Sequence, residues 1–201
     1  MDQDEGYIKF QSNWTPSPPF PDHTWQELAF WRQRLYLKNW IGVYPDGIGF
    51  GNISCREVVG QVCPFLITGS KTGQFELSEA GHFSRVTDWS AEKNTVCCTG
   101  PVVASSESMS HAAIYASLPQ VKVVMHIHDM ALWERHLWEI PTTPATVPYG
   151  SPEMVYALQS LFRPIEHPSE GVVAMAGHRE GLFAFGASFA SAYRMLTDLE
   201  E

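Results

Sequence analysis

The chain has 201 residues and a mass of 22.5 kDa, a size at which one compact domain buries roughly 70% of the surface of its unfolded chain. Hydrophobic residues make up 44% and charged residues 17%, which excludes a disordered, collagen-like or coiled-coil protein. The net charge is −9, and the 13 lysines and arginines nowhere form a run, so we expect no nucleic-acid partner.

The sequence gives no sign of a membrane partner or of export. The most apolar stretch, residues 121–127, is interrupted by Lys122 and His126 and is far shorter than the roughly 20 residues that a transmembrane helix needs. The acidic start lacks the basic and apolar regions of a signal peptide. We therefore expect a cytoplasmic protein, in which the four cysteines, none of them in a CxxC pair, stay reduced.

The first 22 residues carry four prolines and no hydrophobic period, which predicts an extended arm on the domain or on a neighbouring subunit. We expect residues 23–201 to form one domain. Within it, Thr24 to Glu27 matches a capping box and predicts a helix that runs to about Trp40 and is stopped by Gly42.

Beyond residue 47, short segments divided by glycine and proline predict strands and loops, at 53–55, 65–68, 85–87 and 95–98. Further strands are expected at 121–128, 172–176 and 182–185. Helices are expected after residues 105–107, from the Ser151-Pro152 start to Arg163-Pro164, and from Ser188. Because helices alternate with strands in the second half, the sequence predicts a layered α/β domain.

The pattern His126-Ile127-His128 is the sharpest chemical feature. Residues i and i+2 of a strand point to one face, so one divalent ion could bind both imidazoles, while Ile127 packs on the other side. The alternative is a pair of core histidines bound to backbone partners. A metal also needs a third protein ligand, and His178, in the turn of the predicted late hairpin, is the best-placed candidate.

The remaining histidines have simpler explanations. His23 lies in the arm region, and solvated surface positions are expected for His82, His136 and His167. His111 lies one helical turn after Glu107, where a hydrogen bond to that side chain or to the backbone is expected.

Ser105, Ser106 and Glu107 stand at a predicted helix start. They could be capping residues only, with Glu107 as a first-turn acid favoured by the helix dipole. Two hydroxyl groups and free N–H groups at a helix start also suit an anion, so the same residues could hold a phosphate beside a carboxylate. The glycine-rich segments 49–52 and 69–73 could bring backbone N–H groups to a phosphate, or be hairpin turns.

In combination these segments resemble the class II aldolase and adducin head family, which includes fuculose- and rhamnulose-phosphate aldolases and ribulose-phosphate 4-epimerase. Glu107 and His126 lie 19 positions apart, as in that family, and the resemblance runs from about Thr24 to Leu196. The matching segments are residues 51–56, 66–68, 104–107 with His111 and Tyr115, and 123–128.

The resemblance implies a three-layer α/β/α domain around a largely antiparallel sheet, and a homotetramer with sites at subunit contacts. It implies a divalent metal, zinc before manganese or cobalt, on His126, His128 and His178, with Glu107 as acid/base. The implied phosphate-binding residues are Asn52, Ser70, Gly73, Ser105 and Ser106. A metal on the oxygens of a small phosphorylated or acidic sugar-like substrate would lower the cost of an enediolate while the carboxylate moves the proton.

Three departures from the family are visible. A Thr-Gly-Ser-Lys-Thr-Gly run at 68–73 replaces the usual Thr-Pro-x-Gly turn, and Arg179-Glu180 follows His178 where a glycine usually stands. The chain between His128 and His178 is short, without the segment that carries a catalytic tyrosine across the subunit boundary. The proton donor is therefore open among Tyr149, Tyr156 and Asp129.

These observations predict a metal-dependent aldolase-type lyase or epimerase. A dehydratase or decarboxylase on the same scaffold is the first alternative, and a non-catalytic adducin-like association module is the second. Retention of Glu107 together with three candidate ligands argues against the module.

Overall fold

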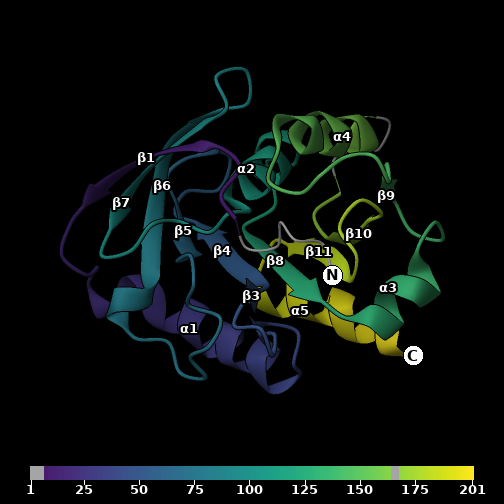
Figure 1. Ribbon diagram of the computed structural model, residues 1–201, viewed down its shortest axis with the longest axis horizontal. Coiled ribbons are helices and arrows are strands. Elements are labelled where there is room, and N and C mark those ends of the chain that lie inside the picture. The colour runs from purple at the N-terminus through teal and green to yellow at the C-terminus, as the bar shows by residue number, and fades with distance from the viewer. Residues whose placement is uncertain (1–6, 164–167) are drawn as a thin grey trace.

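The computed structural model describes residues 7–163 and 168–201. In them, nine strands form one sheet in the order β1-β7-β6-β5-β4-β8-β11-β10-β9 (Figure 1). Of the neighbouring pairs, β1·β7 and β10·β9 are parallel and the others are antiparallel. The expectation of an α/β protein around a largely antiparallel sheet is thereby confirmed.

The described elements have the following bounds. The strands are β1 (Gln11–Pro16), β2 (Gly42–Val43), β3 (Gly49–Phe50), β4 (Asn52–Arg56), β5 (Phe65–Thr68), β6 (Phe83–Ser90), β7 (Thr95–Gly100), β8 (Val123–His128), β9 (Thr142–Thr143), β10 (Gly171–Met175) and β11 (Gly181–Gly186). The helices are α1 (Asp22–Leu37), α2 (Ser108–Ser117), α3 (Met130–His136), α4 (Pro152–Phe162) and α5 (Phe189–Thr197), with short 3-10 turns at Ala80–His82 and Asp198–Glu200.

Helices cover both faces of the sheet, with α2 and α4 on one side and α1 and α5 on the other (Figure 1). Strand β8 shows why both faces are covered, because successive side chains of a strand point to opposite faces of the sheet. Val124 packs with α2 and α4, whereas Val123, Met125 and Ile127 pack with α1 and α5. Each face of the strand is therefore apolar, and a helix layer removes each from water.

The register around β8 assembles the residues that carry chemistry. Asn52 of β4 lies opposite His126 on one side of β8. On its other side, Gly181 of β11 lies opposite His128. Because β11 follows directly from the turn that holds His178, this pairing brings the turn to the end of β8.

The N-terminal segment is not only an arm laid over the surface. Strand β1 pairs in parallel with β7 and so forms one edge of the sheet. Phe10, just before it, is only 6% exposed and belongs to the core shared with α2 and α4. The sequence did not predict this strand because its residues are mostly polar and exposed and show no apolar alternation.

The predicted capping box at Thr24 is wrong. Helix α1 begins at Asp22 after Pro21 and has no side-chain cap hydrogen bond. The helix starts three residues earlier than predicted, so Thr24 lies inside the first turn and its N–H donates to the Pro21 carbonyl. The helix also ends before Trp40, because Asn39 adopts the left-handed conformation at φ 58°.

The later helix starts agree with the sequence. The Ser151 hydroxyl accepts from the Met154 N–H, and the Ser188 hydroxyl accepts from the Ser191 N–H. Helix α3, which Asp129 caps, was not predicted. No helix in the part of the chain that the structure describes combines the length and apolar character needed to span a membrane.

Candidate active site

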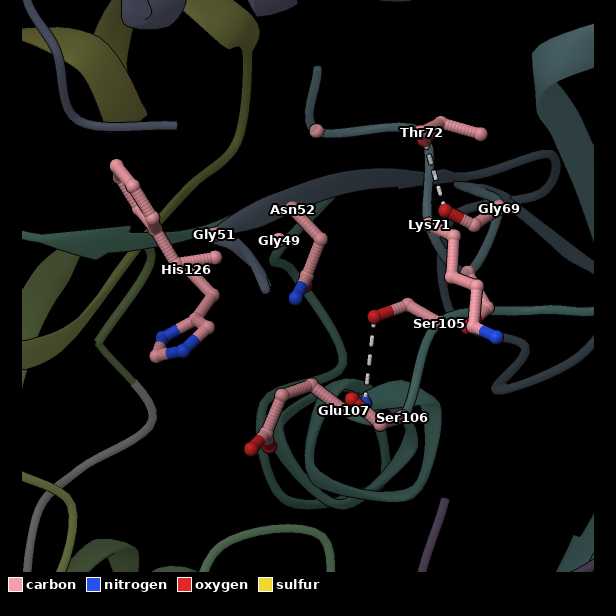
Figure 2. A pocket seen from close by; sticks show the side chains of 13 residues that line it. Gly49, Gly51, Asn52, Gly69, Lys71, Thr72, Ser105, Ser106, Glu107 and His126 are labelled. Carbon is pink, nitrogen blue, oxygen red and sulfur yellow. Dashed lines mark hydrogen bonds between the residues drawn. The ribbon is translucent and has the colours of Figure 1, made fainter. Parts of the chain in front are cut away.

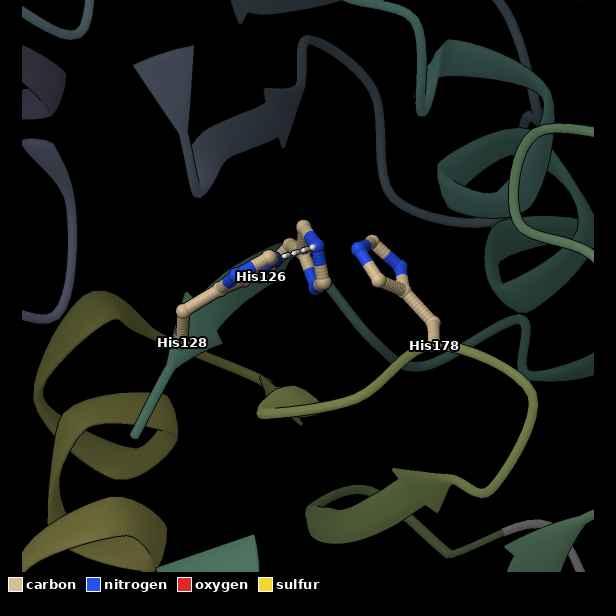
Figure 3. A group of neighbouring side chains, drawn as sticks. All are labelled: His126, His128 and His178. Atoms are coloured by element: carbon tan, nitrogen blue, oxygen red, sulfur yellow. Dashed lines mark hydrogen bonds between the residues drawn. The ribbon is translucent and has the colours of Figure 1, made fainter. Parts of the chain in front are cut away.

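Three histidines converge at the end of β8 (Figure 3). His126 and His128 lie on the same face of the strand, and His178 comes from the turn between β10 and β11. One ring nitrogen of each lies within 4.8 Å of those of the other two, so the group could hold a metal ion. All three residues are buried, at 3% exposure or less.

The outer nitrogens of the two strand histidines have partners that assign their protons. His126 Nδ1 lies 3.2 Å from the Leu182 carbonyl oxygen, which can only accept, so Nδ1 carries the hydrogen. His128 Nδ1 lies 2.8 Å from the Tyr44 hydroxyl, which itself donates to Glu180 Oε2 at 2.8 Å. The single phenolic hydrogen is used there, so His128 Nδ1 donates to Tyr44.

Both Nε2 atoms are then left with lone pairs, and they lie 3.1 Å apart. Two lone pairs at that distance repel each other unless a cation lies between them. Burial, together with the neighbouring histidines, lowers the pKa of His126 and of His128 well below the usual value, so both rings are neutral. Neutral imidazoles with their outer N–H groups fixed are the donor set that a divalent transition metal takes.

Glu107 lies beside this group and is not used as a helix cap. It is the residue before α2, which has no side-chain cap hydrogen bond and no acid in its first turn. Its carboxylate accepts a hydrogen bond of 2.6 Å from Ser110, and Oε1 lies 3.7 Å from His178 Nδ1. A carboxylate that is 2% exposed and aimed at the histidines fits acid/base work better than capping.

A polar pocket opens next to Glu107 and His126 (Figure 2). Asn52, Ser105 and Ser106 line it with the 69–73 segment. The Asn52 side chain points into the space between His126 and Ser105 (Figure 2), and its buried Oδ1 has no hydrogen-bond partner among the described residues. A buried amide without a partner indicates room for a polar ligand.

The glycine-rich walls of this pocket have packing reasons as well. A Cβ on Gly73 would lie 2.2 Å from the Gly42 carbonyl oxygen, and Gly51 has φ 70°. The Ser70 N–H donates to the Val103 carbonyl, so this amide is already used within the protein. Lys71, which we did not single out from the sequence, is the one lysine or arginine among the pocket-lining residues.

The structure adds three more residues around the site. Tyr44 and Glu180 support His128, as described above. Arg32 of α1 is buried, and its guanidinium donates to the carbonyls of Thr72, Gly73, Phe75 and Glu76. Glu180 stood out from the sequence only as part of the Arg179-Glu180 departure after His178. Local sequence gave none of the three a role in the site, because each reaches it through tertiary contacts.

The other histidines lie apart from this arrangement. His111 is buried and its Nδ1 lies 2.6 Å from the Ser54 hydroxyl, not at the Glu107 side chain as one alternative had it. His23 is exposed, and His82 and His136 are partly exposed. His167 lies outside the described residues.

The three candidate proton donors are placed differently. The Tyr149 ring lies beside His178, tilted by 33° with centroids 4.6 Å apart, and its hydroxyl accepts from the Tyr7 N–H. Asp129 caps α3, and Tyr156 is 52% exposed on α4.

Comparison with known proteins identifies the family. The model of the class II aldolase and adducin N-terminal domain matches residues 26–201, so the chain belongs to this family. The sequence-based resemblance and the prediction of an aldolase-family lyase are confirmed at this level. A comparison with curated protein sequences gave no significant match.

Solved structures with the same fold include L-fuculose-1-phosphate aldolase from Thermus thermophilus, at 18% identity and a TM-score of 0.64, covering 90% of both chains. Another is YgbL from Klebsiella pneumoniae, named as a candidate aldolase, epimerase or decarboxylase, at 21% identity and a TM-score of 0.63. That match covers 89% of this chain and 86% of YgbL. At such identities the likeness establishes the fold alone.

Proposed function

We propose that the protein is a metal-dependent lyase or epimerase of the class II aldolase type, acting on a small phosphorylated or acidic sugar-like molecule. The observation that carries this proposal is the convergence of three buried histidines beside a buried carboxylate at the edge of a polar pocket. The helices on both sheet faces support the three-layer scaffold that we expect for such an enzyme.

His126, His128 and His178 would hold a divalent ion, and zinc suits three imidazoles in a site that keeps an open position for substrate. Bound there, the ion would polarise the carbonyl and hydroxyl oxygens of a keto sugar and so make removal of a neighbouring proton easier. Manganese and cobalt accept the same ligands, and metal analysis distinguishes them.

Glu107 would take and return that proton. Its carboxylate lies 3.7 Å from His178 at the inner end of the pocket, and the hydrogen bond from Ser110 holds one oxygen in place. The pocket itself would bind the anionic end of the substrate. Asn52, Ser105, Ser106, Ser70 and Gly73 surround this space, and the lysine at position 71 supplies the positive charge that an acidic protein otherwise lacks there.

Dehydration or decarboxylation on the same site is the second candidate, because the name of the YgbL neighbour includes decarboxylase and the proton donor for aldol cleavage has no fixed place here. An association module without catalysis has no use for a matched set of buried histidines and carboxylate. A small-molecule substrate is therefore the proposed partner.

The test begins with metal analysis of untagged protein, which should contain close to one zinc, manganese or cobalt per chain after reconstitution. The loaded protein is then incubated with a panel of phosphorylated keto sugars and sugar acids, and the products are identified by NMR. Cleavage or epimerisation supports the proposal, and loss of water or CO₂ supports the second candidate. Less than a tenth of a metal per chain after reconstitution would overturn both.

A further inference from the structure

We propose that Tyr44 and Glu180 are positioning residues for His128, forming a relay that holds its Nε2 lone pair toward the metal position. The inference rests on the proposed metal centre and deepens it. Neither residue lines the polar pocket, and the pair acts through the outer nitrogen of the ring.

The direction of the relay follows from what each atom can do. A carboxylate oxygen only accepts, so the 2.8 Å contact between Glu180 Oε2 and Tyr44 uses the phenolic hydrogen. The 2.8 Å contact between Tyr44 and His128 Nδ1 then has the ring N–H as its donor. With Nδ1 protonated, neutral His128 has its lone pair on Nε2, the atom that faces His126. Outer hydrogen bonds of this kind fix the ring and raise the basicity of a metal ligand.

Tyr44 is held by its own surroundings. It begins the turn that joins β2 and β3, where its N–H donates to the Ile48 carbonyl and its carbonyl accepts from Gly47. Its ring lies 4.5 Å from that of Phe50, and the Phe50 ring stacks on His128 with centroids 5.4 Å apart. The hydroxyl therefore has little freedom to leave the His128 ring.

Glu180 occupies a backbone conformation that a glycine would adopt at lower cost. Its φ is 71°, in the left-handed region that a residue with a side chain rarely enters. Despite this strain the residue makes two contacts. The Glu180 carboxylate accepts a hydrogen bond from Tyr44, and its backbone carbonyl accepts one from the N–H of Asp129, directly after β8. A side-chain contact that serves the site is a physical reason for a glutamate here.

The turn between β10 and β11 therefore contributes to two candidate metal ligands, His178 and His128. His178 and Glu180 lie in the same turn, closed by a hydrogen bond from the Gly181 N–H to the His178 carbonyl. His178 presents its own ring, and Glu180 orients His128 through Tyr44. The geometry couples the placement of the third ligand to the orientation of the second.

The experiment measures zinc affinity of metal-free protein by competition with a chromophoric chelator at neutral pH. Tyr44→Phe keeps the ring on Phe50 and removes the relay, and we expect affinity to fall roughly 10–100-fold. The matched control is Tyr193→Phe, which removes the same hydroxyl from a partly exposed tyrosine of α5 and should leave affinity unchanged. Tyr44→Phe within twofold of wild type, or an equal loss in Tyr193→Phe, overturns the proposal.

Two Glu180 variants separate positioning from folding. Glu180→Gly relieves the backbone strain, so the thermal midpoint should stay or rise while zinc affinity falls as in Tyr44→Phe. Glu180→Gln keeps an acceptor oxygen and the chain length, so it should retain affinity closer to wild type. Loss of affinity only in step with loss of the thermal midpoint would show a structural role and overturn the proposal.

These outcomes are distinguishable from failure of the proposed function. Wild-type protein that binds no divalent metal overturns the metal centre and the relay together. Wild-type protein that binds zinc tightly, with Tyr44→Phe and Glu180→Gly equal to it, overturns the relay alone.

Discussion

Glu107 shows how one residue type at one position can be interpreted in two ways until its contacts are known. Taken alone in the sequence it is interpreted first as a helix-start acid, and only the resemblance to the family makes it a catalytic acid/base. The structure leaves α2 without a side-chain cap and turns the buried carboxylate toward His178 and Ser110. A charge that is 2% exposed has lost most of its hydration, and a catalytic role gives a reason to keep it there.

Replacing Glu107 by Gln should therefore lower turnover by about 10²–10⁴-fold, the usual contribution of general acid–base catalysis, because the shape is kept and the base is lost. Metal content should remain that of wild type. Steady-state kinetics of the metal-loaded variant measures this once a substrate is found.

The matched control is Glu153→Gln, which removes an exposed acid from the first turn of α4. It should change stability by only about 0.3–1 kcal/mol and leave turnover intact. Wild-type turnover in a fully loaded Glu107→Gln protein would show that this carboxylate is only a helix-start residue.

His111 gives a prediction about pH. Burial lowers its pKa to about 3, against about 6.5 in the unfolded chain. Below pH 6.5 the His111 side chain binds a proton in the unfolded state but stays unprotonated in the folded state. Its contribution therefore lowers the free energy of unfolding increasingly as the pH falls toward 3. The cost is up to about 1.4 kcal/mol per pH unit within that window.

Urea unfolding of metal-free protein between pH 6.5 and 4.5 checks the sign and the slope. In His111→Gln the free energy of unfolding should fall less steeply with decreasing pH than in wild type, whatever its absolute value. His23→Gln, at an exposed position, should reproduce the wild-type slope. Parallel curves for His111→Gln and wild type would contradict the prediction.

At the scale of elements, alternation and capping chemistry predict what local sequence controls. The period of two along β8 places His126 and His128 on one face and Ile127 on the other, as observed in the packing. The serine caps of α4 and α5 also follow from sequence. Strand β1 and the short helix α3 do not, because their stability comes from pairing and packing with distant segments.

The support of the candidate site was missed for the same reason. Tyr44 and Glu180 are 136 positions apart and meet only because β11 pairs with β8. Likewise, Arg32 lies about 40 positions from the carbonyls that it binds. No local pattern encodes such contacts, whereas the candidate ligands fall within recognisable motifs.

Arg32 yields a prediction for the loop that forms one wall of the pocket. Its guanidinium is buried, which lowers its pKa to about 10, and it donates to four loop carbonyls. Lysine cannot reproduce that planar fork. Arg32→Lys should weaken the loop by about 1.4 kcal/mol, which raises amide exchange of residues 70–78 roughly tenfold.

Hydrogen–deuterium exchange with mass spectrometry measures this directly. Peptides from α2 should keep their wild-type exchange, which shows that the effect is local. Arg34→Lys, at an exposed position of the same helix, provides the control. Unchanged amide exchange at residues 70–78 in Arg32→Lys would show that the loop keeps its structure without the hydrogen bonds from the Arg32 guanidinium.

At the scale of the whole molecule, the family match extends over almost all of the domain that the sequence predicts. The combined motifs were enough to indicate the family because each is a short local run, in β4, in β5, at the start of α2 or in β8. Substrate identity is not encoded in this way, since it depends on how the 69–73 run and any neighbouring subunit shape the pocket.

The last prediction concerns assembly. Large apolar side chains stay exposed on the single chain, among them Leu37 at 65%, Trp138 at 64% and Leu77 at 62%. Such groups favour burial between subunits, and closed symmetric assemblies bury the same surface on every copy. We predict a mass of four times the 22.5 kDa chain by light scattering at micromolar concentration, and a specific activity that falls as dilution lowers that mass. A 22.5 kDa particle at these concentrations would contradict the tetramer, and activity independent of dissociation would show that one chain completes the site.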